Sequence, residues 1–283
     1  MELNQIHMDD TALPAFRRQL EEEERAPGTV EKYLRDVRAF VRWQAGRPLS
    51  KEAAVAWKQE LLSRRYAPAT VNSMLVSLNR FLSFLGLGQC RVKTLRLQRR
   101  VFRQEERELS RGEYARLLET ARKASRPRLE LVMETICATG IRVSELSYIT
   151  LEAVRKGRAD VSLKGKVRTI LLPGKLCRKL EKYARRHKIA SGEIFLTRSG
   201  RGISRGQIWA EMKALCRRAG VAASKVFPHN LRHLFARVFY QSCRDVAKLA
   251  DVLGHSSIET TRIYLISTGV EHARELERLR LIC

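Results

Sequence analysis

The chain has 283 residues, of which 44% are hydrophobic and 30% charged, so two packed domains are expected, and wholesale disorder and fibrous repeats are excluded. No stretch approaches the roughly 18 to 20 apolar residues of a bilayer span, and the polar start is unlike a signal peptide, so we expect a cytoplasmic protein with no membrane partner. A net charge of +25 predicts a polyanionic partner, and nucleic acid is favoured over an anionic membrane surface because no Lys-rich amphipathic helix with an aromatic face stands out.

Residues 9–86 carry a helical pattern and an internal repeat. Thr29–Trp43 has apolar residues at helical spacing after the turn-forming Pro27 and Gly28. Thr70–Phe84 repeats that pattern 41 residues later. Leading helices at about 10–24 and 50–64 complete two helical hairpins. The pattern therefore predicts a four-helix N-terminal domain over residues 1–88.

A basic segment without any acidic residue follows the fourth helix and is predicted as the interdomain linker, residues 89–104. Extended, it reaches roughly 50 Å, enough to pass round a DNA duplex. A solvated linker without contacts is the alternative interpretation. The residues expected to contact DNA are Arg91, Lys93, Arg96, Arg99, Arg100 and Arg103.

The second domain, predicted over residues 105–283, is mostly helical. Ser110 and Glu113 have capping-box spacing, which predicts a helix from Tyr114. Further helical patterns cover residues 129–138 and 144–146, and the period changes to two across 159–172, which indicates a small antiparallel hairpin or sheet. Helices return from Lys175. The predicted fold class is mainly α with a small antiparallel β-sheet.

Residues 270–283 form the last predicted helix, with one apolar stripe. The stripe needs a surface to cover it, either on its own domain or on a neighbouring protomer. Its members are Ala273, Leu276, Leu279 and Ile282.

Several catalytic motifs are missing from the sequence. It has no phosphate-binding glycine loop, no zinc-type histidine pair with a nearby carboxylate and no cluster of acidic residues for two magnesium ions. The six cysteines are far apart and are expected to be reduced thiols. We therefore expect neither a metal site nor metal-dependent nuclease chemistry.

Cationic and imidazole side chains recur through the second domain and end in a tyrosine. His229 and Arg232 are three apart on a helix that begins at Pro228, so they share one face. Ser256 and Glu259 have capping-box spacing, which predicts a short helix carrying the tyrosine. These residues fit a phosphodiester site without a metal. The candidates are Arg142, His229, Arg232, His255 and Tyr264.

The motifs Thr-Gly-Ile-Arg-Val-Ser-Glu-Leu, His-Asn-Leu-Arg-His and Leu-Gly-His-Ser, with a tyrosine nine residues after the last histidine, resemble the signature of the tyrosine recombinases, also called the phage integrase family. The resemblance covers nearly the whole chain, and its layout is similar to that of the two-domain Xer-like members. It implies an N-terminal core-binding, SAM-like domain and a catalytic domain. It also implies a site-specific DNA recombinase that cuts and rejoins DNA through a 3′-phosphotyrosyl intermediate without metal, ATP or other cofactor.

The resemblance implies a role for each candidate. Tyr264 is the nucleophile, and because free tyrosine has a pKa of about 10, it needs activation. Arg142 and Arg232 stabilise charge on the phosphate. His229 is the expected base, and His255 the expected hydrogen-bond donor to the phosphate.

A hairpin lysine is the expected acid for the leaving group, and here the turn is shorter than the family's common pattern. Lys164 is preferred over Lys166. Glu145 is expected to orient Arg142, and His233 is a weaker candidate. Taken singly, each of these residues has an ordinary structural interpretation, for instance a core aromatic for Tyr264.

The resemblance further implies double-stranded DNA with inverted-repeat core sites, a tetramer in the synaptic complex, accessory DNA-bending proteins and a nucleoid-associated place in a bacterial cell. The C-terminal helix would dock on the adjacent protomer. Two other functions are weighed: a type IB topoisomerase-like enzyme, which relaxes DNA without pairing two sites, and a DNA-binding architectural module without catalysis.

Overall fold

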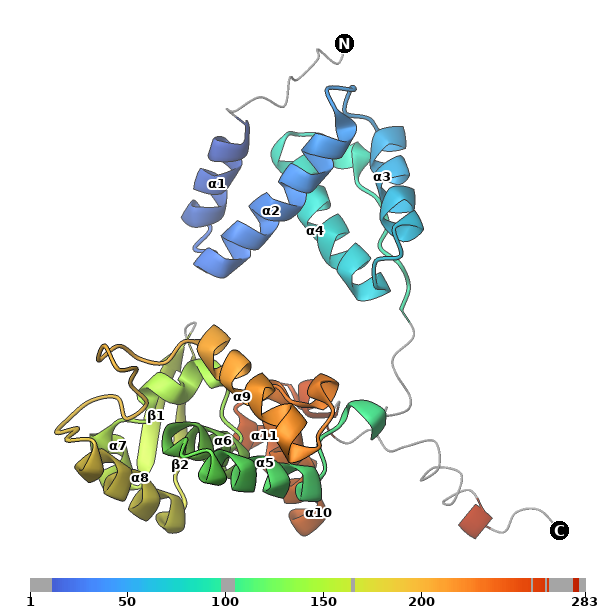
Figure 1. The fold of residues 1–283 in the computed structure, drawn as a ribbon. Helices are drawn as coiled ribbons and strands as arrows, with labels where there is room; N and C mark the ends of the chain where they lie inside the picture. Colours follow the sequence, from blue (N-terminus) through green and yellow to red (C-terminus); the bar gives the residue numbers. More distant parts are fainter. Residues whose placement is uncertain are drawn as a thin grey trace. The chain divides into compact units, whose positions relative to one another are not determined.

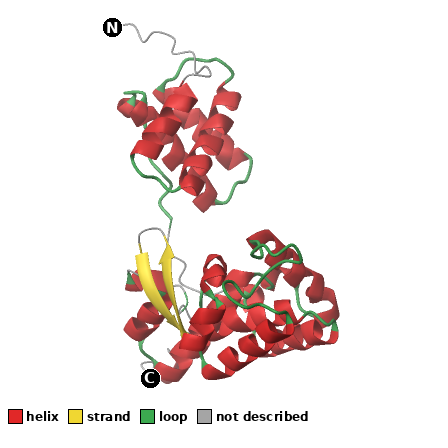
Figure 2. Cartoon of the chain, turned by 90° about the vertical axis from the view of Figure 1, so that its left-hand side faces the viewer, coloured by secondary structure: helices red, strands yellow, loops and turns green. Residues whose placement is uncertain are grey.

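The structure is a computed structural model, and it describes residues 12–97, 105–163, 166–255, 257–262, 264 and 277–279, without the side chains of residues 105, 163, 166 and 262. The chain divides into two compact units, residues 1–99 and 100–283 (Figure 1). The described part is mostly helical with one two-stranded antiparallel sheet (Figure 2), which confirms the predicted fold class. In this part of the chain no helix is both long and apolar enough to cross a membrane.

The first unit consists of the four predicted helices. Proline occupies the first position of α2 and of α4, where its missing N–H costs no helical hydrogen bond. The Ser50 hydroxyl accepts from the Ala53 N–H and caps α3. Buried aromatic and aliphatic side chains between the helices form two core clusters. The helices are α1 (Ala12–Glu22), α2 (Pro27–Gln44), α3 (Lys51–Ser63) and α4 (Pro68–Phe84).

The sequence repeat has a direct structural counterpart where α2 packs against α4. The Ser77 hydroxyl donates to Asp36 Oδ2 at 3.1 Å, and the two residues are 41 apart. Lys32 Nζ donates to the Ser73 carbonyl at 2.6 Å, again across 41 residues. Equivalent positions of the two repeats therefore meet.

The segment after α4 stays attached to the first unit. After the 3-10 helix η1 (Gly88–Cys90), the Asn79 side chain exchanges hydrogen bonds with the backbone of Val92, with N–H donors 2.9 and 2.8 Å from their acceptors. Asn72 does the same with Leu95, at 2.9 and 2.7 Å. The backbone of the basic segment is thus pinned to α4 as far as Leu95.

The second unit packs its helices around one large core. The capping box of Ser110 and Glu113 is present, but α5 begins at Arg111 rather than at the expected Tyr114, because the three residues after an N-cap are already helical. The helix α7 (Leu151–Lys156) was not predicted. The other helices are α5 (Arg111–Lys123), α6 (Pro127–Thr139), α8 (Gly174–Arg186), α9 (Arg205–Ala219), α10 (Pro228–Cys243), α11 (Val246–Leu253) and α12 (Ile258–Arg262).

The predicted β-hairpin is formed by β1 (Arg158–Leu163) and β2 (Lys166–Leu171), paired antiparallel with Val161 opposite Arg168. Along β2 the exposed Val167 and Leu171 alternate with the part-buried Arg168 and the buried Ile170. One face of β2 therefore turns towards the rest of the second unit.

The chain end departs from one expectation. Tyr264 does not lie on a helix: α12 ends at Arg262, and the Tyr264 N–H closes a turn on the Thr261 carbonyl at 3.0 Å. Ser256, the expected cap, lies outside the described residues. So does the predicted C-terminal helix, except for residues 277–279.

Candidate active site

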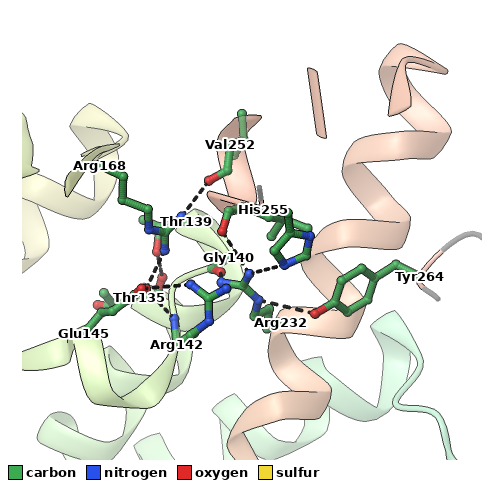
Figure 3. Close-up of polar contacts among 11 residues, drawn as sticks. Thr135, Thr139, Gly140, Arg142, Glu145, Arg168, Arg232, Val252, His255 and Tyr264 are labelled. Carbon is green, nitrogen blue, oxygen red and sulfur yellow. Dashed lines mark hydrogen bonds and ion pairs between the residues drawn. The ribbon is translucent and has the colours of Figure 1, made fainter. Parts of the chain in front are cut away.

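Four segments of the second unit bring the motif residues together. Arg142 follows the end of α6, His229 and Arg232 lie on the first turns of α10, His255 follows α11, and Tyr264 lies beyond α12. Figure 3 shows Arg142, Arg232, His255 and Tyr264 pointing towards one another. The cluster is therefore a product of tertiary packing, because its members are spread over more than a hundred residues of chain.

Arg232 is the centre of this cluster and is only 1% exposed. Its Nη1 donates to the Gly140 carbonyl at 2.5 Å and its Nη2 to the Leu253 carbonyl at 3.0 Å. Both carbonyls end helices, where the helix dipole favours a cation. Burial lowers the pKa of Arg232, but a guanidinium does not lose its proton in proteins. The site thus holds one fixed, desolvated positive charge.

Two glycines allow the segments to approach this charge. Gly140 caps α6 with φ +66°, and a Cβ there would overlap the Phe235 ring. Gly254 caps α11 with φ +64°, and a Cβ there would overlap Cδ of Arg168. Both the left-handed backbone and the close contact favour glycine at these positions.

His255 is held from both ring nitrogens. Its Nε2 lies 2.9 Å from Nη2 of Arg232, and its Nδ1 lies 2.8 Å from the hydroxyl of Thr261, which is fully buried. Because arginine can only donate, Nε2 is the acceptor, and the proton of the neutral ring sits on Nδ1. Burial, followed by the charges of Arg232, Arg142 and Arg168, lowers the pKa of His255 to about 4.

Tyr264 is 4% exposed and lies among three imidazoles. The His255 ring is stacked on it at 5.8 Å between centroids, His233 meets it edge-on at 4.5 Å, and the His229 ring lies 6.3 Å away. Its hydroxyl oxygen accepts from Arg232 Nε at 3.5 Å. The phenol oxygen is therefore already beside the buried cation.

The other two histidines are also held neutral. Burial and the neighbouring His229 lower the pKa of His233 to about 4. His229 has an exposed side, yet desolvation and then the charges of Arg232 and Arg142 lower its pKa. Neutral imidazole can accept a proton, as the base role of His229 requires.

Arg142 is the most accessible cation of the cluster, with 43% of its side chain exposed. The Glu145 carboxylate accepts from the Arg142 backbone N–H at 2.8 Å and from its Nη1 at 3.1 Å. Glu145 also pairs with Arg168, whose Nη1 donates to the Val252 carbonyl at 3.0 Å. Burial raises the pKa of Glu145, but these hydrogen bonds outweigh it and the pKa is lowered.

The charges of this arrangement call for an anion. Three guanidinium groups, those of Arg142, Arg168 and Arg232, face one carboxylate, that of Glu145, so positive charge is in excess. A phosphodiester would offset part of this excess, and the forked donors of arginine match its oxygens. Among the described residues, no group of three His, Cys, Asp or Glu side chains is arranged to hold a metal ion.

The remaining predicted residues fall into two groups. Arg91, Lys93 and Arg96 are exposed, and the backbone around the first two is held to α4 by the hydrogen bonds of Val92 and Leu95. Lys164 lies outside the described residues, and of Lys166 only the backbone, at the start of β2, is described. Also outside the described residues are Arg99, Arg100 and Arg103.

Two side chains of the cluster were missed by the motifs. Thr261 orients the His255 ring, and Arg168 joins the hairpin to Glu145. A buried threonine on a polar helix and a single arginine in a basic strand carry no recognisable sequence signal. By contrast, His233 was visible in the motif, and the structure places its ring against Tyr264.

Comparisons with known proteins agree with this layout. Residues 107–269 match the phage integrase family, and residues 13–89 match the phage integrase N-terminal SAM-like domain. The tyrosine recombinase XerC of Roseiflexus castenholzii is 31% identical over 275 residues, covering 88% of this chain and 87% of that protein. XerA of Pyrococcus furiosus is 27% identical over 278 residues, covering 95% and 94%.

Solved structures share the fold. A lambda integrase tetramer bound to a Holliday junction matches with a TM-score of 0.72 at 18% identity, covering 89% of this chain and 76% of that one. The XerH recombinase in a pre-cleavage complex with its difH substrate matches with a TM-score of 0.68 at 17% identity, covering 97% and 90%.

Proposed function

The chain belongs to the phage integrase family of tyrosine recombinases, whose members carry out site-specific DNA recombination, and from this premise we propose that the reaction takes place in the cluster around Tyr264. The single observation that carries this assignment is the contact between the Tyr264 hydroxyl and Arg232 Nε. It supports Tyr264 as the nucleophile and Arg232 as the cation that binds the phosphate, because the two groups are already in contact.

In the proposed reaction, Arg142 and Arg232 bind the non-bridging oxygens of the scissile phosphate. Tyr264 Oη attacks phosphorus and loses its proton to His229. The bond from phosphorus to the 5′-oxygen breaks, and Lys164 gives that oxygen a proton. The products are a 3′-phosphotyrosyl ester and a free 5′-hydroxyl. Because the ester keeps a phosphodiester's bond energy, a 5′-hydroxyl of a second strand displaces Tyr264 without ATP.

His255 has to change its hydrogen bond in this reaction. In the structure its Nε2 accepts from Arg232. A phosphate oxygen that takes over the Arg232 donor would leave Nε2 without a partner, and its added negative charge would favour a proton there. His255 would then donate to the phosphate, as expected for its role.

The nucleophile is tested with a nicked suicide substrate that traps the covalent intermediate. Tyr264→Phe should form no covalent adduct and should still bind DNA. Tyr240→Phe is the matched control, since Tyr240 lies on α10 and packs on the same small core; its adduct yield should equal that of the unchanged protein. Normal adduct yield from Tyr264→Phe would refute the assignment.

The proposed substrate is double-stranded DNA with inverted-repeat core sites, bound by domains 1–88 and 105–283 and the linker 89–104. A tetramer would hold two such sites, as four protomers hold a junction in the lambda integrase neighbour. Accessory DNA-bending proteins and a nucleoid-associated location in a bacterial cell belong to the same proposal.

Assembly is tested by removing residues 270–283, the segment proposed to dock on the next protomer. The truncated protein should fold and bind a single site but should lose pairing of two sites and recombination, measured by gel shift and by a two-site assay. Recombination at the full-length rate would place the segment on its own domain. The four-protomer assembly would be refuted by a different mass of the complex on DNA.

A further inference from the structure

Arg168 lies outside the motifs, yet it contacts two of the four segments that carry the site, the one with Arg142 and the one with His255. It stands on β2, two residues after the strand begins. Its Nη2 pairs with Glu145, which in turn holds both the backbone and the side chain of Arg142. Its Nη1 donates to the Val252 carbonyl, in the last turn of α11, just before Gly254 and His255. Figure 3 shows these two contacts on opposite sides of the guanidinium.

The contacts of Arg168 are poor as a device for stability. The side chain is only 13% exposed, so the charge is largely removed from water. Its Nε is buried and has no hydrogen-bond partner among the described residues, which lowers the stability of the folded state because a buried donor is left unsatisfied. Buried ion pairs are often replaceable by apolar packing without loss of stability. A reason other than stability is therefore needed for this residue.

Position supplies that reason. β1 and β2 pair as far as Leu163 and Lys166, and Lys164, the lysine proposed as the acid, lies between them in the sequence. From the hairpin, Arg168 forms an ion pair with Glu145 on the segment that carries Arg142. A further polar contact with the hairpin comes from Tyr148, whose hydroxyl donates to the Ser162 carbonyl at 2.5 Å. Arg168 is thus the ionic anchor of the hairpin beside the site.

We propose that Arg168 is a positioning residue of strand cleavage: through Glu145 and the Val252 carbonyl it fixes the β1–β2 hairpin, and with it the acid lysine, relative to Arg142 and His255. This inference rests on the proposed function, because it presumes that a hairpin lysine protonates the leaving group. General acids contribute about 10²- to 10⁴-fold, and misplacement of one forfeits part of that factor.

The test compares two suicide substrates, one with the natural 5′-oxygen leaving group and one with a 5′-bridging sulfur, which needs no proton. Arg168→Met should cleave the oxygen substrate about 100-fold more slowly than the unchanged protein. On the sulfur substrate it should cleave at close to the unchanged rate. Arg168→Lys keeps the positive charge but loses the forked pair of donors. On the oxygen substrate its cleavage rate should lie between those of Arg168→Met and the unchanged protein. An equal loss on both substrates would overturn the proposal.

Arg128 provides a matched control for loss of a part-buried arginine. Its Nη1 donates to the Leu196 carbonyl at 2.7 Å and its Nη2 to Glu211 at 2.6 Å, so it has the same kinds of partner as Arg168 in the same unit. Arg128→Met should lower the midpoint of thermal unfolding without changing the ratio of the two cleavage rates. If Arg128→Met also shifted that ratio, the effect would come from general loosening and not from Arg168.

A double-mutant cycle tests whether Arg168 acts through the acid lysine or through another group. If Arg168 acts only through the acid lysine, Arg168→Met should add no further loss to Lys164→Ala on the oxygen substrate. Multiplied losses would mean that Arg168 acts elsewhere, for instance through Arg142. Failure of the proposed function would look different, because the unchanged protein would then form no adduct that depends on Tyr264.

Discussion

Arg232 Nε lies 3.5 Å from the hydroxyl oxygen of Tyr264, although the two residues are 32 apart in the chain. The other donors of this guanidinium reach the Gly140 and Leu253 carbonyls and the His255 ring. The only side-chain oxygen among these partners is thus the phenol oxygen of Tyr264. A phosphate bound by Arg232 would therefore lie next to the proposed nucleophile.

The identity of the acid is tested by replacing Lys164 and Lys166 one at a time. Lys164→Ala should slow cleavage of the oxygen substrate by about 10²- to 10⁴-fold, because the leaving 5′-oxygen then departs without a proton. A 5′-bridging sulfur should restore the rate. Lys166→Ala should behave like the unchanged protein on both substrates. If instead Lys166→Ala cleaved the oxygen substrate slowly and the sulfur substrate at the normal rate, Lys166 would be the acid.

The close approach at Gly140 predicts a large cost for an added methyl group. Gly157 offers the matched control, since it caps α7 with φ +69° and a Cβ there meets nothing within 4 Å. Gly157→Ala should cost about 1 kcal/mol of unfolding free energy from the backbone alone. Gly140→Ala should cost roughly 1–3 kcal/mol more, because the Phe235 ring must move. Urea unfolding of both variants measures the difference, and equal costs would contradict the packing described.

Gly254→Ala tests the same principle beside Arg168. A Cβ would overlap the Arg168 side chain, which is flexible enough to move away. The stability cost should therefore be smaller than for Gly140→Ala. The displaced Arg168 should nevertheless reproduce the leaving-group dependence expected of Arg168→Met. A large loss of stability with an unchanged ratio of cleavage rates would argue against this.

The neutral histidines predict how stability depends on pH. The pKa values of His233 and His255 fall from 6.5 to about 4 in the folded protein. Between these values the unfolded chain binds more protons, so stability is fully present above about pH 6.5 and declines as the pH falls towards 4. Each group contributes a slope of at most about 1.4 kcal/mol per pH unit.

Urea unfolding at pH 7 and pH 5 measures this slope. His233→Gln should make the pH dependence shallower. His187→Gln, which changes an exposed histidine at the end of α8, is the control and should leave the slope as it is. An unchanged slope in His233→Gln would mean that His233 is not held neutral by the fold.

The basic linker predicts the salt dependence of DNA binding. Each phosphate contact adds about −0.9 to the slope of log affinity against log salt, so replacing Arg99 and Arg100 by alanine should reduce the slope by about two units. Sequence preference should change little, because phosphate contacts carry no base information. The control replaces Arg185 and Arg186, both exposed on α8, and should keep the slope. If the variant without Arg99 and Arg100 also showed an unchanged salt slope, these two residues would make no phosphate contact.

The sequence alone predicted the four helices of the first unit, the helices α5 and α6, the hairpin and the motif residues, but not α7. Helical and strand periods report which face of an element is buried, and the Ser110 capping box and the prolines of α2 and α4 are local signals. The repeat between α2 and α4 was equally visible. For these features the physical cause lies within a few residues of chain, so a local pattern records it.

Tertiary structure alone decided how the site is held. Arg168 meets Glu145 across 23 residues and Val252 across 84, and His255 accepts from Arg232 where its motif suggested a donor to phosphate. The turn at Tyr264 likewise replaced the expected helix. Which donor meets which acceptor depends on how closely elements pack, and here that distance is set by Gly140 and Gly254 against side chains far away in the chain. No local period or spacing in the sequence encodes contacts between residues so far apart in the chain.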